Sequence, residues 1–277
     1  MIPIRIKQFP AFVRQMRQRN AVLKRPEPVG QVFHLCFFSC HSYFSYLYCS
    51  LHSLVKHADG IDFRVLIFSD NDQPLSVAQI QVIQTLIPNS EVIPWPKSMG
   101  WGEEQIGWIW RAYQRAAEGA ADNDYIARID SDVFFFNDRI FRAVGRSNAD
   151  LVGDGHFVNF EYCQGGCYFF KASAVRQIVA QFDTEQMADV LKEIDIVVED
   201  IAAHHFAKRL GLKIWQTWFM MFPDELRISG GLTKWQRNKF SCAHFVMKNK
   251  AKMLEAYDDE VLKGQGSEEY HKSLDVV

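Results

Sequence analysis

The 277-residue sequence contains no apolar run long enough to span a bilayer, and its first residues lack the apolar region of a signal peptide. Both absences predict a cytoplasmic protein. The chain also has no excess of basic charge, because 31 lysines and arginines face 33 aspartates and glutamates. A nucleic-acid partner therefore has no support in the composition. Internal repeats and low-complexity tracts are missing as well, which indicates an ordinary globular chain.

No Cys-x-x-Cys pair occurs among the six cysteines, which are Cys36, Cys40, Cys49, Cys163, Cys167 and Cys242. A chain of this size without a secretion signal needs no disulfide bonds for its stability. We therefore expect buried free thiols. A zinc site formed by Cys163, Cys167 and a histidine is the alternative.

Residues 1–28 carry a local excess of basic side chains, with Glu27 as the single acid. The basic residues are Arg5, Lys7, Arg14, Arg17, Arg19, Lys24 and Arg25. Apolar residues recur at helical spacing at Phe9, Phe12, Val13 and Met16, which predicts a helix with an apolar and a cationic side. Such a helix can rest on an anionic membrane surface, or it can dock on the body of the protein with its basic face in water.

Apolar runs alternate with helical patterns from residue 29 to about residue 257. Strands are predicted at 32–38, 63–68, 91–95, 125–130 and 167–171, and helices at 45–57, 77–86, 103–118, 173–181 and 199–210. The first helix is predicted to bury Leu47, Leu51, Leu54 and Val55. This alternation favours an α/β fold with a mostly parallel sheet and helices on both faces. We predict one domain over 29–257, with a basic segment at 1–28 and a polar tail at 258–277.

Asp130 and Asp132 stand at the end of an apolar run that begins at Tyr125. Alternate residues of a strand project to the same side, so the two carboxylates can converge on a divalent cation and the phosphate that it carries. Two other Asp-x-Asp pairs, at 70–72 and 122–124, lie in polar links and are typical of turns and caps. Only the pair at 130 and 132 follows a buried-strand pattern directly, which is where open α/β folds bind their ligands.

Further motifs follow this pair in order: Gly165-Gly166, then Glu199-Asp200 at the start of a helix, then a late His244. Over roughly residues 31–250 this order resembles that of GT-A-fold, nucleotide-sugar-dependent glycosyltransferases. Segments 165–171, 199–201 and 207–211 are similar to the Fringe and β-1,3-galactosyltransferase pattern, whereas 32–70 is similar to the glycogenin-type family. The resemblance implies a single GT-A (Rossmann-like) domain with a mostly parallel, mixed sheet.

The resemblance also implies a UDP-sugar donor and a Mn²⁺ or Mg²⁺ ion as cofactor. Asp132 would bind the metal directly, Asp130 would reach the ribose and the metal shell, and His244 would supply a further ligand. Such a metal stabilises the charge that grows on the diphosphate when the glycosyl bond breaks. Lys248 would lie near the diphosphate, although the Gly and Lys-Pro-Trp that usually follow the histidine in the glycogenin-type family are absent here.

A base is needed for direct displacement, because a sugar hydroxyl is a poor nucleophile at neutral pH. Asp200 is the predicted base, with Glu199 beside it, and inversion of configuration would follow. Carboxylates in a first helical turn also interact with the helix dipole, so a purely structural role is the alternative. The other alternative is a retaining enzyme of the same fold, which needs no such base and for which residues near Gln164 are the candidates.

Other residues are predicted to contact the donor. Arg128 shares a face with Asp130 if the strand is regular, and Arg111 lies on the long helix before it. Phe38 and Ser39 end the first strand, where the fold receives the nucleotide base, and Asp70 ends the next. By resemblance, Gly165 and Gly166 lie under the donor sugar, where the absence of a β-carbon lets the backbone approach it.

The sequence therefore predicts a metal-dependent glycosyltransferase that moves a sugar from a UDP donor to a hydroxyl of a glycan, glycolipid or polysaccharide. Residues 1–28 would give it peripheral contact with the cytoplasmic face of the membrane. One alternative is a non-catalytic protein that binds nucleotide sugars or a membrane surface. A metal-dependent phosphatase or nuclease also needs paired carboxylates, but the chain has no basic field and no acid cluster around an Asp nucleophile.

Overall fold

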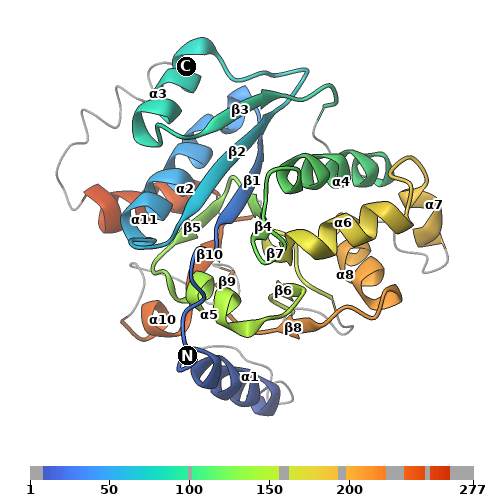
Figure 1. Ribbon diagram of the computed structural model, residues 1–277. Helices are drawn as coiled ribbons and strands as arrows, with labels where there is room; N and C mark the ends of the chain where they lie inside the picture. Colours follow the sequence, from blue (N-terminus) through green and yellow to red (C-terminus); the bar gives the residue numbers. More distant parts are fainter. Residues whose placement is uncertain are drawn as a thin grey trace.

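The computed structural model describes residues 9–98, 102–155, 162–192, 198–222, 234–246 and 250–262. A seven-stranded sheet forms its centre, in the order β3-β2-β1-β4-β7-β6-β8 (Figure 1). The strands in that order are β3 (Glu91–Pro94), β2 (Phe63–Ser69), β1 (Phe33–Ser39), β4 (Tyr125–Asp130), β7 (Cys167–Lys171), β6 (Leu151–Gly153) and β8 (Ile214–Gln216). Strand β7 runs antiparallel to both of its neighbours, and every other pairing is parallel. The predicted α/β fold with a mostly parallel, mixed sheet is confirmed.

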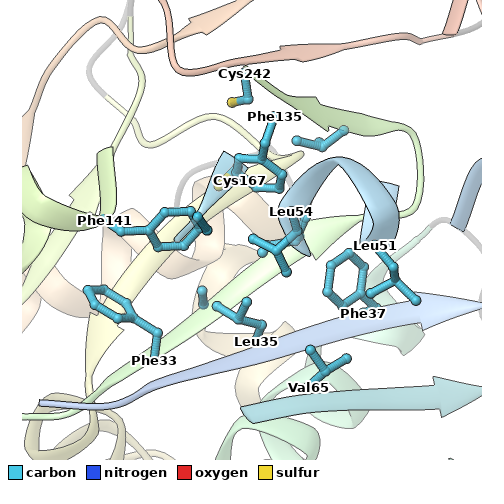
Figure 2. Close-up of a cluster of buried hydrophobic side chains, with 14 of the residues drawn as sticks. Phe33, Leu35, Phe37, Leu51, Leu54, Val65, Phe135, Phe141, Cys167 and Cys242 are labelled. Carbon is cyan, nitrogen blue, oxygen red and sulfur yellow. The ribbon is translucent and has the colours of Figure 1, made fainter. Parts of the chain in front are cut away.

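Helices cover both faces of this sheet because residues of each central strand alternate between two apolar cores. In β1, Leu35 and Phe37 join the core beneath α2 (Phe44–His57), α3 (Val77–Leu86) and α5 (Arg139–Ser147). Figure 2 shows both side chains against Leu51 and Leu54 of α2. Cys36 joins the opposite core, beneath α4 (Glu103–Ala117), α6 (Ala172–Gln181) and α8 (Glu199–Arg209).

Two details of this packing differ from the sequence-based expectation. Val55 was predicted to face the core but is 40% exposed, because α2 turns it toward solvent while Leu51 and Leu54 are fully buried. Helix α5 was not predicted, although its buried Ile140, Phe141 and Val144 give it one apolar side.

A second sheet of three short strands packs at the end of the first. It has the order β5-β10-β9, with β5 at Val133–Phe135, β10 at Cys242–His244 and β9 at Met220–Met221. Strand β10 pairs antiparallel with β5, and this register sets His244 opposite Val133. The small sheet therefore brings the late histidine next to the segment that carries Asp130 and Asp132.

The N-terminal helix α1 (Phe9–Val22) docks on the body of the protein. Met16 is buried against Trp218, with Val13 beside it, and Arg19 is 2% exposed. The guanidinium of Arg19 donates to the carbonyl oxygens of Trp218 and Lys239, each at 2.8 Å. The docked arrangement is thus the one present, while Arg14 and Arg17 of this helix remain exposed.

The described C-terminal part packs on α2. Helix α11 (Lys250–Tyr257) is followed by a helical turn, η5 (Asp258–Leu262), and Lys56 Nζ donates to the carbonyl oxygens of Glu260 at 2.9 Å and Val261 at 2.7 Å. The folded body therefore extends beyond the domain end predicted at residue 257. The remaining short helices are η2 (His41–Tyr43), α7 (Met187–Leu191) and α10 (Lys234–Lys239).

The cysteines are free thiols, and all except Cys40 are buried, as predicted. None of the helices in the described ranges combines the length and the apolar character required to cross a membrane.

Candidate functional site

The parallel strands β1, β2 and β4 end at one edge of the large sheet. Ser39 stands beside Ser69 in the register of β1 and β2, and Phe38 stands beside Asp130 in that of β1 and β4. Beyond β4 the chain turns at once into β5, and the hydroxyl of Ser131 donates to the carbonyl oxygen of Phe38 at 3.1 Å. This turn fixes the positions of both aspartates at the carboxyl edge of the sheet, where open α/β folds bind ligands.

Asp130, Asp132 and His244 form one compact group, whose ligand atoms all lie within 4.8 Å of one another. Nε2 of His244 is 3.0 Å from Oδ1 of Asp132 and 3.4 Å from Oδ2 of Asp130. Asp132 and His244 are buried, and Asp130 is partly exposed. No other group of this kind occurs among the described residues, so the alternative zinc site at Cys163 and Cys167 finds no support.

The three side chains fit a divalent cation by their chemistry. Two carboxylates and one imidazole suit a metal that accepts oxygen and nitrogen ligands together. Four carboxylates meet here (Asp130, Asp132, Glu199 and Asp200) against the cations Arg128 and Lys250. When His244 gives up its proton to bind a metal, the cluster carries two uncompensated negative charges, which one divalent ion neutralises.

Neighbouring charges shift the pKa values of His244 and Asp130. Burial lowers the pKa of His244, but hydrogen bonds to Asp130 and Asp132 outweigh burial and raise that pKa to about 9. Burial likewise raises the pKa of Asp130, yet Arg128 and His244 more than offset it and hold that pKa well below its usual range. Asp130 is therefore ionised at neutral pH and is available as a ligand.

The glycine pair lies between His244 and Asp200. The carbonyl oxygen of Gly166 accepts from the backbone N–H of Asp130 at 2.8 Å, and Gly166 has a φ of 89°. A β-carbon on Gly166 would lie 2.4 Å from Nδ1 of His244. On the other side, Gly165 N–H donates to Oδ2 of Asp200 at 2.9 Å. Only glycine at position 166 leaves room for the imidazole ring.

Asp200 opens α8 and is held by two backbone donors, because its second oxygen accepts from the N–H of Ile201 at 2.9 Å. Burial raises the pKa of Asp200, and the hydrogen bonds from Gly165 and Ile201 only partly offset that effect. A carboxylate with a raised pKa accepts a proton more readily than an ordinary aspartate does.

Arg128 lies between Asp130 and Glu199. Its NH2 is 3.0 Å from Oδ1 of Asp130, which confirms that the two residues share a face, and its NH1 is in direct contact with Oε2 of Glu199. Glu199 also accepts hydrogen bonds from the hydroxyls of Tyr168 and, at 3.2 Å, Tyr113. Both carboxylate oxygens of Glu199 are thus occupied by contacts with other side chains of this chain.

The residues predicted to hold the nucleotide lie at the same edge. Phe38 is half-buried and stacks on Phe68 with ring centroids 5.1 Å apart. Ser39 is buried, and its hydroxyl has no hydrogen-bond partner among the described residues. Asp70 accepts from the backbone N–H groups of Asp72 and Gln73, which confirms the predicted turn.

Arg111 is not brought to this group. Its guanidinium donates to the hydroxyl of Thr184 at 3.1 Å, pairs with Glu185 at 3.0 Å and lies over the ring of Trp108. These contacts join α4 to the segment before α7.

Lys248 lies outside the described residues. A neighbouring cation, Lys250, approaches the acids, with Nζ 3.5 Å from Oδ2 of Asp132 and 3.9 Å from the ring centroid of Tyr43. Sequence reasoning missed Lys250, because the spacing after His244 does not reveal where α11 begins.

Comparison with protein-family models and with curated protein sequences finds no match. Solved structures do match. The galactosyltransferase LgtC in complex with donor and acceptor sugar analogs is 12% identical, with a TM-score of 0.52 over 87% of this chain and 99% of that chain. The WbbM bifunctional glycosyltransferase is 12% identical, with a TM-score of 0.52 over 90% and 53% of the two chains. The glycosyltransferase GlyE of Streptococcus pneumoniae TIGR4 is 11% identical, with a TM-score of 0.52 over 89% and 63%.

The chain therefore has the α/β fold of GT-A-type glycosyltransferases. The match in fold does not distinguish the Fringe and β-1,3-galactosyltransferase pattern from the glycogenin-type family, so both of those resemblances stay predictions.

Proposed function

We propose that this chain is a metal-dependent glycosyltransferase that moves a sugar from a UDP donor to a hydroxyl of a glycan, glycolipid or polysaccharide acceptor. The observation that carries the proposal is the convergence of Asp130, Asp132 and His244 at the carboxyl edge of a sheet with a glycosyltransferase fold. Mn²⁺ is the preferred ion, because imidazole is a poorer ligand for Mg²⁺ than for transition metals. When bound, such an ion stabilises negative charge on the departing diphosphate.

In this proposal, different residues of the protein bind different parts of the donor. The ends of β1 and β2, at Phe38, Ser39 and Asp70, receive the base and ribose. Lys250 lies on the other side of Asp132 and adds a positive charge for the diphosphate, in the role first expected of Lys248. Gly165 lies beside Asp200, because a β-carbon there would meet Oδ2 of Asp200 at 3.3 Å, and the glycine pair is proposed to lie under the donor sugar.

Asp200 acts as the base in this proposal, and the transfer inverts the anomeric configuration. Its support is the raised pKa and the position across the glycine pair from the metal ligands. Retention is the alternative, in which residues near Gln164 would act in place of Asp200. The anomer of the product, read by proton NMR, separates the two, because a retained configuration contradicts Asp200 as the base of a direct displacement.

The exposed face of α1 is proposed to rest on the anionic cytoplasmic face of a membrane. Arg14 and Arg17 are exposed on α1, and Lys24 and Arg25 are exposed just after it, while Arg19 anchors the opposite side of the helix. Cosedimentation with anionic but not neutral vesicles, lost when these four cations are replaced by glutamine, is the expected result. Equal recovery with both vesicle types contradicts this contact.

Thermal unfolding with UDP and Mn²⁺ tests the donor site before the sugar is known. Ligands that bind only the folded state raise its melting temperature. We expect UDP and Mn²⁺ together to stabilise the wild type and the Asp122→Ala variant, since Asp122 belongs to another Asp-x-Asp pair and its side chain is 86% exposed. The Asp132→Ala variant should show no shift, and a wild-type-like shift in it contradicts the site.

A further inference from the structure

Arg128 reaches the metal ligands from the border of an apolar core, with 17% of its side chain exposed. It is the cross-strand partner of Tyr168 in the antiparallel pairing of β4 with β7, so both side chains point to the face covered by α4, α6 and α8. Tyr113 and Tyr168 belong to the apolar cluster on that face and are 1% and 0% exposed. An arginine at such a position is costly unless its charge is paired and hydrogen-bonded.

A continuous set of contacts supplies this pairing. The hydroxyls of Tyr113 and Tyr168 are 2.6 Å apart and hydrogen-bonded, and both lie within hydrogen-bonding distance of Oε1 of Glu199. The other oxygen of Glu199, Oε2, contacts NH1 of Arg128. NH2 of Arg128 forms an ion pair with Oδ1 of Asp130 at 3.0 Å. Glu199 thus uses one oxygen for the two tyrosines and the other for Arg128, while Asp130 uses one for Arg128 and the other for His244.

This division of oxygens determines which atom of Asp130 is presented to the site. Oδ1 is occupied by Arg128, and Oδ2 is the oxygen that faces Nε2 of His244 at 3.4 Å. Residues that hydrogen-bond a metal-ligating side chain fix its orientation and change metal affinity without touching the metal.

We propose that Tyr168 is a positioning residue for the metal centre, assisted by Tyr113, and that it acts through Glu199 and Arg128 on Asp130. The inference rests on the proposed function, because it takes Asp130, Asp132 and His244 as ligands. It gives Glu199 an orienting role in place of a direct role in catalysis.

The test is Mn²⁺ affinity measured by titration calorimetry on the full chain, without nucleotide. Loss of an outer-shell partner typically weakens metal binding by about 10- to 100-fold. Since Tyr168 acts through two intermediates, Tyr168→Phe should weaken it by about tenfold, at the low end of that range. The matched control is Tyr125→Phe. It removes the buried hydrogen bond from the Tyr125 hydroxyl on β4 to the carbonyl oxygen of Ala149 at 2.8 Å, and it should leave Mn²⁺ affinity unchanged.

A double-mutant cycle separates positioning from a merely structural effect. In a Glu199→Gln background the network is already broken, so adding Tyr168→Phe should produce little further loss of Mn²⁺ affinity. A Tyr168→Phe variant with wild-type affinity, or losses equal to that of Tyr125→Phe, overturns the positioning role while the metal site itself stands. Absence of Mn²⁺ binding by the wild type overturns both proposals, and the Asp132→Ala variant identifies the binding as that of this site.

Discussion

Nε2 of His244 lies 3.0 Å from Oδ1 of Asp132 because the small sheet pairs β10 with β5 directly after the aspartates. Asp130, the last residue of β4, belongs to the large sheet instead. The three ligands therefore meet at the junction of two sheets.

Gly166→Ala should damage both stability and the metal site. Its φ of 89° is unfavourable for alanine, and the new β-carbon would lie 2.4 Å from Nδ1 of His244. We expect a loss of at least about 2 kcal/mol in the free energy of unfolding, the upper end of the usual cost of left-handed backbone, and at least about tenfold weaker Mn²⁺ binding. Urea unfolding and calorimetry measure the two effects.

Gly211→Ala is the control for this substitution. Gly211 has a φ of 65°, but no atom lies within 4 Å of the position of a β-carbon. The variant should lose about 1 kcal/mol from backbone strain alone and keep its Mn²⁺ affinity. If both variants bind Mn²⁺ like the wild type, close packing of Gly166 on His244 has no functional importance.

As the pH is lowered, the rate of sugar transfer should begin to fall at a higher pH than it would with a base of ordinary aspartate pKa. A base works only when deprotonated, so activity is present above the pKa of Asp200 and is lost as the pH falls through it. Burial raises the pKa of Asp200 above its ordinary value, which moves the loss toward neutral pH. The pH profile of UDP-sugar hydrolysis, in which water replaces the acceptor, measures this limb.

Asp200→Asn should abolish the acidic fall of the pH profile together with most of the activity. General base catalysis typically contributes about 10²- to 10⁴-fold, and we expect a loss in that range with unchanged UDP affinity. Full activity in this variant, or an unchanged acidic limb, rules out Asp200 as the base.

Arg19→Ala should destabilise the fold through the docking of α1. Burial lowers the pKa of Arg19 to about 10, so the side chain remains charged at neutral pH while it bonds to the carbonyl oxygens of Trp218 and Lys239. We expect a loss of about 2–3 kcal/mol, the usual worth of hydrogen bonds to a charged group. The exposed Arg17→Ala should stay within about 0.5 kcal/mol of the wild type in chemical denaturation. Equal stability of the two variants contradicts the docking.

Long periodic patterns made most of the large sheet and its helices predictable from the sequence. The pattern over 103–118 predicted α4, and the structure buries its Ile106, Ile109, Trp110 and Tyr113. The small sheet was beyond such reasoning, because strands of two or three residues carry no periodicity and exist only through their pairing partners. Helix α5 was missed for a related reason, since it follows β5 within a few residues and its nine residues contain a glycine.

The polar site was predictable for the residues that belong to motifs in the order typical of GT-A-fold glycosyltransferases. Asp130, Asp132, His244, Arg128 and the Gly165–Asp200 pair meet as expected. Contacts between distant surfaces were not predictable. The bond from Tyr168 to Glu199 and the approach of Lys250 to Asp132 depend on how α8 and α11 dock, and no local pattern encodes that.

The most direct test of the account is the release of UDP from a panel of UDP-sugars, with Mn²⁺ and with excess chelator. We expect the wild type to hydrolyse at least one donor with Mn²⁺, to lose that activity in chelator and to regain it when Mn²⁺ is restored. Asp132→Ala should be inactive throughout, whereas Asp122→Ala should behave like the wild type. Hydrolysis that persists in chelator, or in Asp132→Ala, contradicts a metal-dependent glycosyltransferase built on Asp130, Asp132 and His244.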